Sequence, residues 1–457
     1  MSVYSEQASP LQLLQAFPVG EAFSSGPASL DAEALRALQE MRFAKVMKRA
    51  WQVPFYQRHW GETGLEPGDI TGLDDLVRLP VVTKDDLMDS VERFPPLGDY
   101  HGMARPEGGQ FRTVLQTTSG TTGAPQPLFF GARDREIQNI LLARAYLLQG
   151  LQTDDVVHSV YGFGMVNGGH YIREAVLYYT DALLLPAGTG SQTGSLQQVE
   201  LMQRFGATVL VGFGDFLHKL ARTAEDAGLI PGEDIPLRMI SGHIAHDARE
   251  TLSKAWGGAA VYDWYGVGDT GIVAAEGPAR EGLYIWEDAH FVEIVAPDTG
   301  LPVGPGCDGN LCITVLFKDS VYPIVRFDTQ DVSRLLPPDL SSGIKFRRIA
   351  GFSGRSDNMV KLRGVNVYPT AIGSLLYGFS GTTGEYVCRL KRIDDQDELT
   401  VMVEYDGSDP DFEQLISRHL RARLGVRLGI EVVAVGETAG LTELEARQKP
   451  KRLIDER

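Results

Sequence analysis

Alternating apolar and amphipathic segments are clearest in the middle of the chain. Four short apolar runs are separated there by three segments with a helical spacing of apolar positions. The runs cover residues 181–186, 207–211, 237–240 and 259–265, and the helical segments cover 195–205, 215–228 and 247–256. Ser195 and Gln198 form a capping-box signature at the start of the first helical segment. Strand and helix repeated in this order predict a largely parallel sheet layered with helices.

The part of the chain before this pattern is expected to be mainly helical. A long helix is predicted at residues 31–51, and proline-punctuated loops follow it. An alternating, β-branched run at 111–117 predicts a strand. The next element is expected to be a helix capped by Asp134, with apolar positions on one face between residues 137 and 148.

Later segments predict a different arrangement. Strands are expected at 284–295 and 311–317, and the turn residues 297–300 between them favour antiparallel pairing; another strand-like run covers 321–327. After residue 355 we expect strands at 386–392, 399–405 and 430–435 with a helix at 411–424.

These patterns predict an α/β protein with two domains. The large N-terminal domain, residues 1–356, has layered, mostly parallel sheets plus a subsidiary antiparallel sheet. The small C-terminal domain, residues 357–457, is α+β and mobile, and Asp357 marks the boundary. A chain of 457 residues is long for one ordinary domain, which agrees with this division.

Charge and cysteine content narrow the possible partners. The formal net charge of −17 disfavours nucleic acid and anionic membranes as partners. Three cysteines cannot form a disulfide framework, and neither a signal peptide nor an apolar run long enough to cross a bilayer stands out. We therefore expect a soluble, cytoplasmic protein without a membrane partner. The oligomeric state stays open.

A glycine-rich loop follows the run at 111–117. It comprises Thr118, Ser119, Gly120, Thr121, Thr122 and Gly123. Hydroxyl groups and backbone N–H groups without obstructing Cβ atoms suit the binding of a polyphosphate. The loop is not a Walker A motif, because no G-x-x-x-x-G-K-[ST] sequence occurs in the chain, and Gln126 stands where the lysine would be sought. On these residues alone, an ordinary glycine- and threonine-rich turn is an alternative.

The loop resembles the phosphate-loop signature of the adenylate-forming superfamily, which contains acyl-CoA synthetases, nonribosomal adenylation domains and luciferases. Several further segments resemble the phenylacetate-CoA ligase branch of this superfamily, in the expected order and over nearly the whole chain. These segments are residues 53–56, 79–87, 282–288, 326–331, 354–369 and 449–455. Ordered matches of this kind are far more specific than any one motif.

The resemblance implies a two-step reaction that uses ATP, Mg²⁺ and a small-molecule carboxylic acid. The carboxylate attacks the α-phosphate to give an acyl-adenylate and pyrophosphate, and a nucleophile such as CoA then takes the acyl group. By resemblance, Asp331 accepts the ribose hydroxyls and Arg355 contacts the ribose and phosphates. Lys449 would bridge the attacking carboxylate and the α-phosphate. Asp357 would be the hinge, and Lys361 would serve the second half-reaction or be a surface charge.

Other residues are assigned by the same resemblance. Tyr265 should lie near the adenine. The acid pocket should be lined by glycines interleaved with aromatic residues, which suits an aryl or small cyclic acid. The pocket residues are Tyr161, Gly162, Phe163, Gly164, Phe213, Gly214 and Gly266. For several of the aromatic residues, plain core packing is the alternative.

The chain departs from the family pattern at three positions. Gly268 replaces a hydroxyl residue, and Asp269 replaces the glutamate that helps to hold Mg²⁺, which leaves the metal geometry open. His243 replaces a glutamate near the adenine, and it is interpreted as structural or facing the ligand rather than as a metal ligand. The altered pair Gly268 and Asp269 leaves room for an amide-forming ligase in which an amine or amino acid intercepts the adenylate. A catalytically inactive binding protein on the same fold is a third hypothesis.

Overall fold

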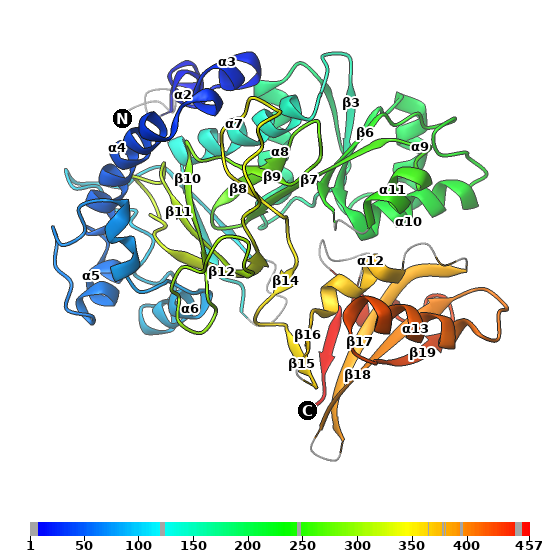
Figure 1. Ribbon diagram of the computed structural model, residues 1–457. Helices are drawn as coiled ribbons and strands as arrows, with labels where there is room; N and C mark the ends of the chain where they lie inside the picture. Colours follow the sequence, from blue (N-terminus) through cyan, green and yellow to red (C-terminus); the bar gives the residue numbers. More distant parts are fainter. Residues whose placement is uncertain are drawn as a thin grey trace. The chain divides into compact units, whose positions relative to one another are not determined.

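The structure is a computed structural model that describes residues 8–118, 124–244, 248–363, 365–376, 379, 381–393, 396–443 and 450–457 (Figure 1). It comprises two compact units, and both are discontinuous in sequence. Unit 1 contains Met1–Thr153, Phe163–Ala182 and Trp264–Gly351, and unit 2 contains Asp154–Gly162, Leu183–Asp263 and Phe352–Arg457. The predicted boundary at Asp357 stays a prediction.

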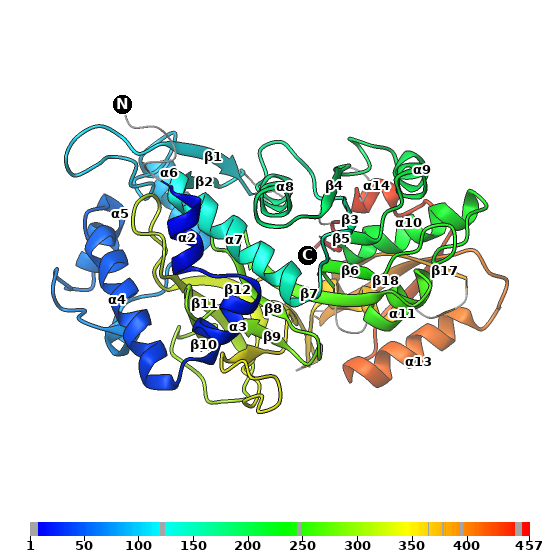
Figure 2. The same cartoon turned by 90° about the horizontal axis from the view of Figure 1, so that it is seen from above.

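Helices dominate the first part of unit 1. They are α2 (Pro10–Ala16), α3 (Gly20–Ser25), α4 (Ala32–Ala50), α5 (Pro54–Gly61) and α6 (Lys84–Arg93), with short 3₁₀ turns at Pro27–Ser29 and Leu73–Arg78. The predicted long helix is confirmed as α4, and the carboxylate of Asp31 caps it by accepting from the Ala34 N–H at 2.9 Å. The helices α2 and α3 pack on α7 (Ala132–Leu148), as Figure 2 shows. α8 (Gly168–Tyr179) is also a neighbour of α7.

A strand that the sequence analysis missed lies between the glycine-rich loop and α7. The predicted strand is confirmed as β1 (Thr113–Thr117), but it pairs antiparallel with β2 (Pro127–Gly131), so the helix does not follow the loop directly. The predicted cap was also wrong. Gly131 is the N-cap residue of α7, and Asp134 lies in the first turn, where its carboxylate accepts from the Gly131 N–H at 3.2 Å.

The antiparallel part of unit 1 consists of two groups of strands. In the first, the end of β7 (Ala260–Val267) pairs with β8 (Gly271–Glu276), which pairs with β9 (Leu283–Ile285) and then β13 (Arg348–Ile349). In the second, β11 (Gly309–Val315) lies between β10 (His290–Val295) and β12 (Phe327–Ser333). The antiparallel expectation is confirmed, but the run at 284–295 forms two strands and the run at 321–327 precedes β12 instead of forming a strand.

Unit 2 contains the parallel sheet predicted from the βα alternation. The strand order is β4 (Leu183–Pro186), β3 (Val156–Ser159), β5 (Val209–Phe213), β6 (Met239–His243) and the first half of β7. α9 (Ser195–Phe205), α10 (Gly214–Asp226) and α11 (Arg249–Ala255) connect these strands and share a core with them. The capping box was wrong, because Gly194 is the N-cap residue of α9 and Gln198 is buried against His158 at 3.0 Å.

The C-terminal part of unit 2 is the expected α+β arrangement. Its sheet has the order β19 (Gly429–Val433), β18 (Gln396–Tyr405), β17 (Thr382–Ile393) and β20 (Leu453–Asp455). α13 (Phe412–Leu424) and α12 (Ile372–Leu376) pack on this sheet, and α14 (Ala439–Thr442) precedes β20. This sheet is preceded in sequence by β14 (Gly354–Arg355), by the hairpin of β15 (Val360–Leu362) and β16 (Val365–Val367), and by a 3₁₀ turn at Pro369–Ala371.

Among the helices of the described ranges, none combines the length and apolar character needed to cross a membrane. Cys307 is exposed, Cys312 and Cys388 are buried, and all three are free thiols.

Candidate active site

In unit 1, the residues at the two ends of the glycine-rich loop are hydrogen-bonded to each other. The Thr118 N–H donates to the Gln126 carbonyl oxygen, and the Gln126 N–H donates to Thr118 Oγ1, both at 3.1 Å. Thr117 and Pro127 form the last register pair of β1 and β2. The predicted phosphate-binding residues from 119 to 123 lie outside the described residues. The described residues on either side of the loop are hydrogen-bonded to each other where β1 and β2 pair.

Gln126 connects this loop to a buried carboxylate. Its side-chain Nε2 donates to Asp269 Oδ1 at 2.7 Å, and the Tyr322 hydroxyl donates to the same oxygen at 2.6 Å. Asp269 is 5% exposed, and burial is the largest influence, so the pKa of its carboxyl group is raised. Sequence reasoning proposed Asp269 but gave Gln126 no role and missed Tyr322, which lies in an irregular segment and carries no motif.

A buried lysine completes this group. Lys318 Nζ lies 3.4 Å from the carbonyl oxygens of Phe129 and Asp269, and 4.4 Å from the centroid of the Tyr322 ring. Burial lowers the pKa of Lys318 to about 8, against the opposing influence of the carboxylates of Asp134 and Asp269. Gln126, Asp269, Lys318 and Tyr322 together are called the loop-base cluster. The sequence analysis did not single out this lysine.

The loop-base cluster is compatible with Mg²⁺, the cation expected for this site. In the ranges that the structure describes, no group of three or more His, Cys, Asp or Glu side chains could hold a metal ion by itself. Mg²⁺ is commonly held by one or two carboxylates together with substrate phosphates and water. Asp269 is a buried carboxylate beside the described ends of the glycine-rich loop and is a group of this kind.

A second buried carboxylate is fixed by a tyrosine. Tyr265, at the end of β7, donates its hydroxyl to Asp331 Oδ2 at 2.8 Å, and Thr329 Oγ1 lies 3.2 Å from the same hydroxyl oxygen. Asp331 is inside β12 and not after a strand at 321–327 as expected. The structure therefore brings the predicted adenine and ribose residues together, with the tyrosine hydroxyl directed at the carboxylate.

The structure explains why position 266 is a glycine, which the sequence alone did not reveal. A Cβ atom at this position would lie 2.4 Å from the carbonyl oxygen of Gly271, where β7 and β8 pair with a register shift. A distance below 3.0 Å is incompatible with any side chain unless the backbone moves. The glycine therefore allows the close approach of two strands beside Tyr265.

The predicted arginine and the predicted hinge residue contact each other in unit 2. Arg355 donates through Nε to Asp357 Oδ1 at 2.8 Å and through Nη2 to Asp357 Oδ2 at 2.5 Å. Lys361 lies on the hairpin of β15 and β16, paired in register with Asn366, and its side chain is exposed. Rotation about Asp357 would therefore affect the same carboxylate that holds Arg355.

The predicted acid-pocket residues fall into both units. In unit 2, the Tyr161 hydroxyl lies 2.7 Å from His243 Nδ1, and the Phe213 ring stacks on the His243 ring with centroids 4.8 Å apart. Gly162 follows Tyr161, and Gly214 begins α10 after Phe213. His243 thus joins two predicted pocket residues, in agreement with its interpretation as structural or facing a ligand.

In unit 1, the segment after residue 162 forms a separate group. The Phe163 ring lies edge-on to His170, with centroids 5.5 Å apart, and His170 Nε2 is 2.8 Å from the Gly164 carbonyl oxygen. Gly164 has φ +118°, a value that side chains rarely tolerate. The Thr117 N–H donates to the Met165 carbonyl oxygen at 2.7 Å, so this segment runs along the end of β1.

Comparison with known proteins shows the family of this chain. Residues 364–457 match the family model for the AMP-binding enzyme C-terminal domain. Phenylacetate-coenzyme A ligase from Pseudomonas putida is 30% identical over 427 residues, which cover 90% of this chain and 92% of that protein. The chain belongs to the phenylacetate-CoA ligase branch of the adenylate-forming superfamily. The corresponding ligase from Aromatoleum evansii is 29% identical over 437 residues, covering 93% of this chain and 94% of that protein.

A solved structure extends the likeness to three dimensions. The crystal structure of 2-hydroxyisobutyryl-CoA ligase in the postadenylation state, in complex with R3-HIB-AMP, has a TM-score of 0.83 and 26% identity. It covers 94% of this chain and 91% of that chain. The fold class expected from the sequence is thereby confirmed for this member of the phenylacetate-CoA ligase branch.

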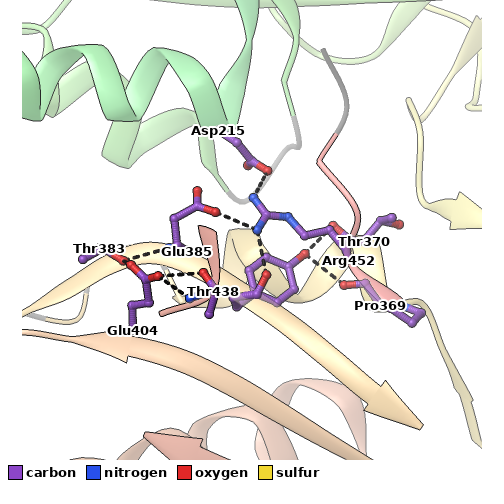
Figure 3. A network of polar contacts seen from close by, with 9 residues as sticks. Asp215, Pro369, Thr370, Thr383, Glu385, Glu404, Thr438 and Arg452 are labelled. Atoms are coloured by element: carbon purple, nitrogen blue, oxygen red, sulfur yellow. Dashed lines mark hydrogen bonds and ion pairs between the residues drawn. The ribbon is translucent and has the colours of Figure 1, made fainter. Parts of the chain in front are cut away.

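The C-terminal motif of the phenylacetate-CoA ligase branch includes Lys449, which lies outside the described residues. Arg452, three residues later, is described and is 4% exposed. Figure 3 shows its polar contacts. Its Nη2 lies 2.5 Å from Asp215 Oδ2 on α10, and its Nη1 lies 3.0 Å from Glu385 Oε2 on β17. Nη1 also donates to the Tyr386 carbonyl oxygen at 2.7 Å. Within unit 2, the ion pair of Arg452 with Asp215 therefore connects the C-terminal segment to α10.

Proposed function

We propose that this chain is an ATP-dependent, AMP-forming ligase that activates a carboxylic acid and transfers the acyl group to CoA. The observation that carries this proposal is the link from the glycine-rich loop to a carboxylate. Gln126 closes the loop with Thr118 and also donates to Asp269 at 2.7 Å. A phosphate loop and a cation-binding carboxylate held by one residue, through its main chain and its side chain respectively, are suited to ATP bound with Mg²⁺.

In the first half-reaction, the acid carboxylate attacks the α-phosphate, and pyrophosphate leaves. Ser119–Gly123 are assigned to the β- and γ-phosphates, through backbone N–H and hydroxyl groups. Asp331, oriented by Tyr265, is assigned to the ribose hydroxyls. Mg²⁺, when bound, neutralises charge on the phosphates, and Asp269 is the protein group that would hold it. Lys318 supplies a buried positive charge beside Asp269.

Lys449 is assigned to the attacking carboxylate and the α-phosphate. An ammonium group directed at developing negative charge accelerates a reaction because that charge is greatest in the transition state. Arg452 supports this assignment, because a buried arginine with two carboxylate partners fixes the segment that follows Lys449. Arg355, held by Asp357, is assigned to the ribose and phosphates of ATP.

In the second half-reaction, the CoA thiolate attacks the acyl carbon and AMP leaves. Asp357 is proposed as the hinge of a mobile C-terminal domain, residues 357–457, that presents Lys449 in the first step and the β15–β16 hairpin in the second. The exposed position of Lys361 on that hairpin is compatible with a contact to CoA. Names of relatives support this assignment, since the relatives described above are CoA ligases.

The acid is proposed to be an aryl or small cyclic carboxylic acid. Support comes from the aromatic rings at Tyr161, Phe163 and Phe213 and from the phenylacetate-coenzyme A ligases that resemble this chain. Aromatic side chains favour flat apolar ligands by offset stacking or edge contacts.

The decisive variant is Lys449→Ala. We expect pyrophosphate release with ATP and acid to fall by about 10²–10³-fold, by analogy with the loss of one oxyanion-hole donor. Thioester formation from a supplied acyl-adenylate and CoA should stay close to the wild-type rate. Lys391→Ala is the matched control, because Lys391 is a half-exposed lysine on β17 that pairs with Glu456 at 3.2 Å. Equal loss of both half-reactions would contradict the assigned role of Lys449.

A further inference from the structure

Two of the segments that resemble the family, residues 53–56 and 79–87, have been assigned no role in the candidate active site. Both contact one irregular stretch of unit 1, residues 320–326, which joins β11 to β12 and is called the Tyr322 segment. Tyr322 is the residue of this stretch that belongs to the loop-base cluster. The two family segments therefore contact the part of the chain that supports Asp269.

Tyr56, the last residue of the segment 53–56, lies on α5 and fixes the middle of the Tyr322 segment. Its hydroxyl donates to the Pro323 carbonyl oxygen at 2.8 Å and accepts from the Val325 N–H at 3.3 Å. Tyr56 is 2% exposed. Buried backbone groups need hydrogen-bond partners, and one hydroxyl group here serves both a carbonyl and an N–H of irregular backbone.

The segment 79–87 fixes the end of the Tyr322 segment. The Val82 N–H donates to the Arg326 carbonyl oxygen at 2.8 Å, and Arg326 Nη1 donates to the Leu79 carbonyl oxygen at 2.5 Å. Nε and Nη2 of Arg326 also bind the carboxylate of Glu293 on β10, both at 3.1 Å. The last residue of the Tyr322 segment is thus held through its backbone and through its side chain.

Tyr322 itself has a backbone conformation that its side chain disfavours. Its φ is +47°, in the left-handed region, where a bulky residue is an outlier. The Tyr322 N–H donates to the His101 carbonyl oxygen at 2.9 Å, and its ring packs beside that of Tyr100 with centroids 5.1 Å apart. Such conformations persist only where the surrounding structure over-determines them, and they cluster at functional sites. The contacts of Tyr56 and Arg326 supply this constraint.

The constrained conformation brings the Tyr322 hydroxyl to Asp269. The hydroxyl donates to Asp269 Oδ1 at 2.6 Å, and Gln126 Nε2 donates to the same oxygen at 2.7 Å. Two donors that meet on one oxygen restrict rotation of the carboxylate about its Cβ–Cγ bond. Ligands of metal ions are commonly oriented by partners of this kind, and loss of one partner weakens metal binding.

We propose that Tyr322 is a positioning residue for the cation that accompanies ATP, and that Tyr56 acts through it by fixing the backbone of the Tyr322 segment. The inference rests on the proposed function, which assigns Asp269 to Mg²⁺. Orientation is what the hydrogen bond supplies, because a donor draws negative charge from a carboxylate and would by itself weaken the attraction for a cation. The family segment 53–56 thereby acquires a role that involves no contact with substrate.

The test measures how much Mg²⁺ contributes to nucleotide binding, without turnover. α,β-Methylene-ATP, from which pyrophosphate cannot leave, is titrated into the protein by calorimetry, once with excess Mg²⁺ and once with EDTA. The dissociation constant in EDTA divided by that in Mg²⁺ is called the Mg²⁺ advantage. We expect Tyr322→Phe to lower the Mg²⁺ advantage by about 10–100-fold, the usual cost of losing a partner that orients a metal ligand. Asp269→Asn should lower it at least as far.

Tyr56→Phe tests the longer connection. It should lower the Mg²⁺ advantage by about 2–10-fold, the effect of one neutral hydrogen bond. Pyrophosphate release gives a second readout for both tyrosine variants: the half-saturating Mg²⁺ concentration should rise, and excess Mg²⁺ should restore most of kcat. A general loss of folded protein would instead lower kcat at every Mg²⁺ concentration.

Two control variants match these changes at other places in the chain. Tyr284→Phe removes a hydroxyl that donates to the Asp339 carboxylate, as Tyr322 does to Asp269. Tyr386→Phe removes a buried hydroxyl that donates to a proline carbonyl oxygen at 2.9 Å, as Tyr56 does. We expect a lower melting temperature in all four variants, but a lower Mg²⁺ advantage only in the two test variants.

The outcomes separate this inference from the proposed function. If Asp269→Asn lowers the Mg²⁺ advantage and Tyr322→Phe leaves it unchanged or raises it, the positioning role is refuted and the ligase assignment stands. A loss in Tyr322→Phe with no change in Tyr56→Phe would refute the action of Tyr56. No change in Asp269→Asn would overturn the inference together with the assignment of Asp269 to Mg²⁺. If no acid releases pyrophosphate, the ligase assignment fails, and the calorimetric ratios decide the inference alone.

Discussion

The hydrogen bond from Tyr265 to Asp331 offers a direct test of the assigned nucleotide site. Tyr265→Phe removes only the hydroxyl, which lies 2.8 Å from Asp331 Oδ2. Asp331 is 6% exposed, so water can do little to replace the lost donor. A hydrogen bond to a charged group contributes about 1.5–3 kcal/mol, which corresponds to a fall of roughly 10–150-fold in kcat/KM for ATP.

Pyrophosphate release is measured at varied concentrations of ATP and of 2′-deoxy-ATP. If Asp331 accepts the ribose hydroxyls, the wild-type enzyme prefers ATP, and Tyr265→Phe narrows this preference because the carboxylate is less well oriented. Tyr284→Phe is a matched control, because the Tyr284 hydroxyl donates to the carboxylate of Asp339 in the same unit, outside the assigned site. An unchanged preference in Tyr265→Phe, or the same loss in Tyr284→Phe, would refute the reasoning.

Three further predictions concern Asp215, Lys318 and Asp357. Asp215→Asn removes one of the two carboxylate partners of buried Arg452, so pyrophosphate release should fall about tenfold or more while CoA capture of a supplied adenylate changes little; equal losses would contradict the proposed support of Lys449. Burial lowers the pKa of Lys318 to about 8, so the native state binds fewer protons than the unfolded chain between about pH 8 and 10.5, and stability should rise with pH in that window. Lys318→Met lacks this rise. The melting temperature of the wild type minus that of Lys318→Met, measured by calorimetry, should therefore increase with pH in this window, whereas a constant difference would count against a buried, titrating lysine. Asp357→Asn releases Arg355 from a partly exposed ion pair, which should lower the KM for ATP by up to about fivefold; a higher KM would show that the pair positions the arginine.

The parallel core could be predicted because its signal is local. Each strand of unit 2 is a short apolar run, and each connecting helix carries its own amphipathic spacing. β2 was missed because its residues directly follow a glycine-rich loop, and a loop followed by an amphipathic helix resembles a simple strand-to-helix connection. Asp134 resembled a cap, but Gly131 takes that place and Asp134 reaches back from the first turn.

Only part of the candidate site could be predicted from the sequence. Motifs pointed to Tyr265, Asp269 and Asp331, but not to the partners that orient them. Gln126 and Tyr322 reach Asp269 across 143 and 53 positions of the chain, and no periodicity connects residues so far apart.

One measurement tests the central claim most directly. The purified protein is incubated with ATP, Mg²⁺, CoA, a mixture of amino acids and a panel of aryl and cyclic carboxylic acids, and the products are identified by mass. The account predicts an acyl-CoA thioester together with AMP and pyrophosphate, with none of the three formed when the acid is omitted. An N-acyl amino acid without thioester, or no product with any acid of the panel, would contradict it.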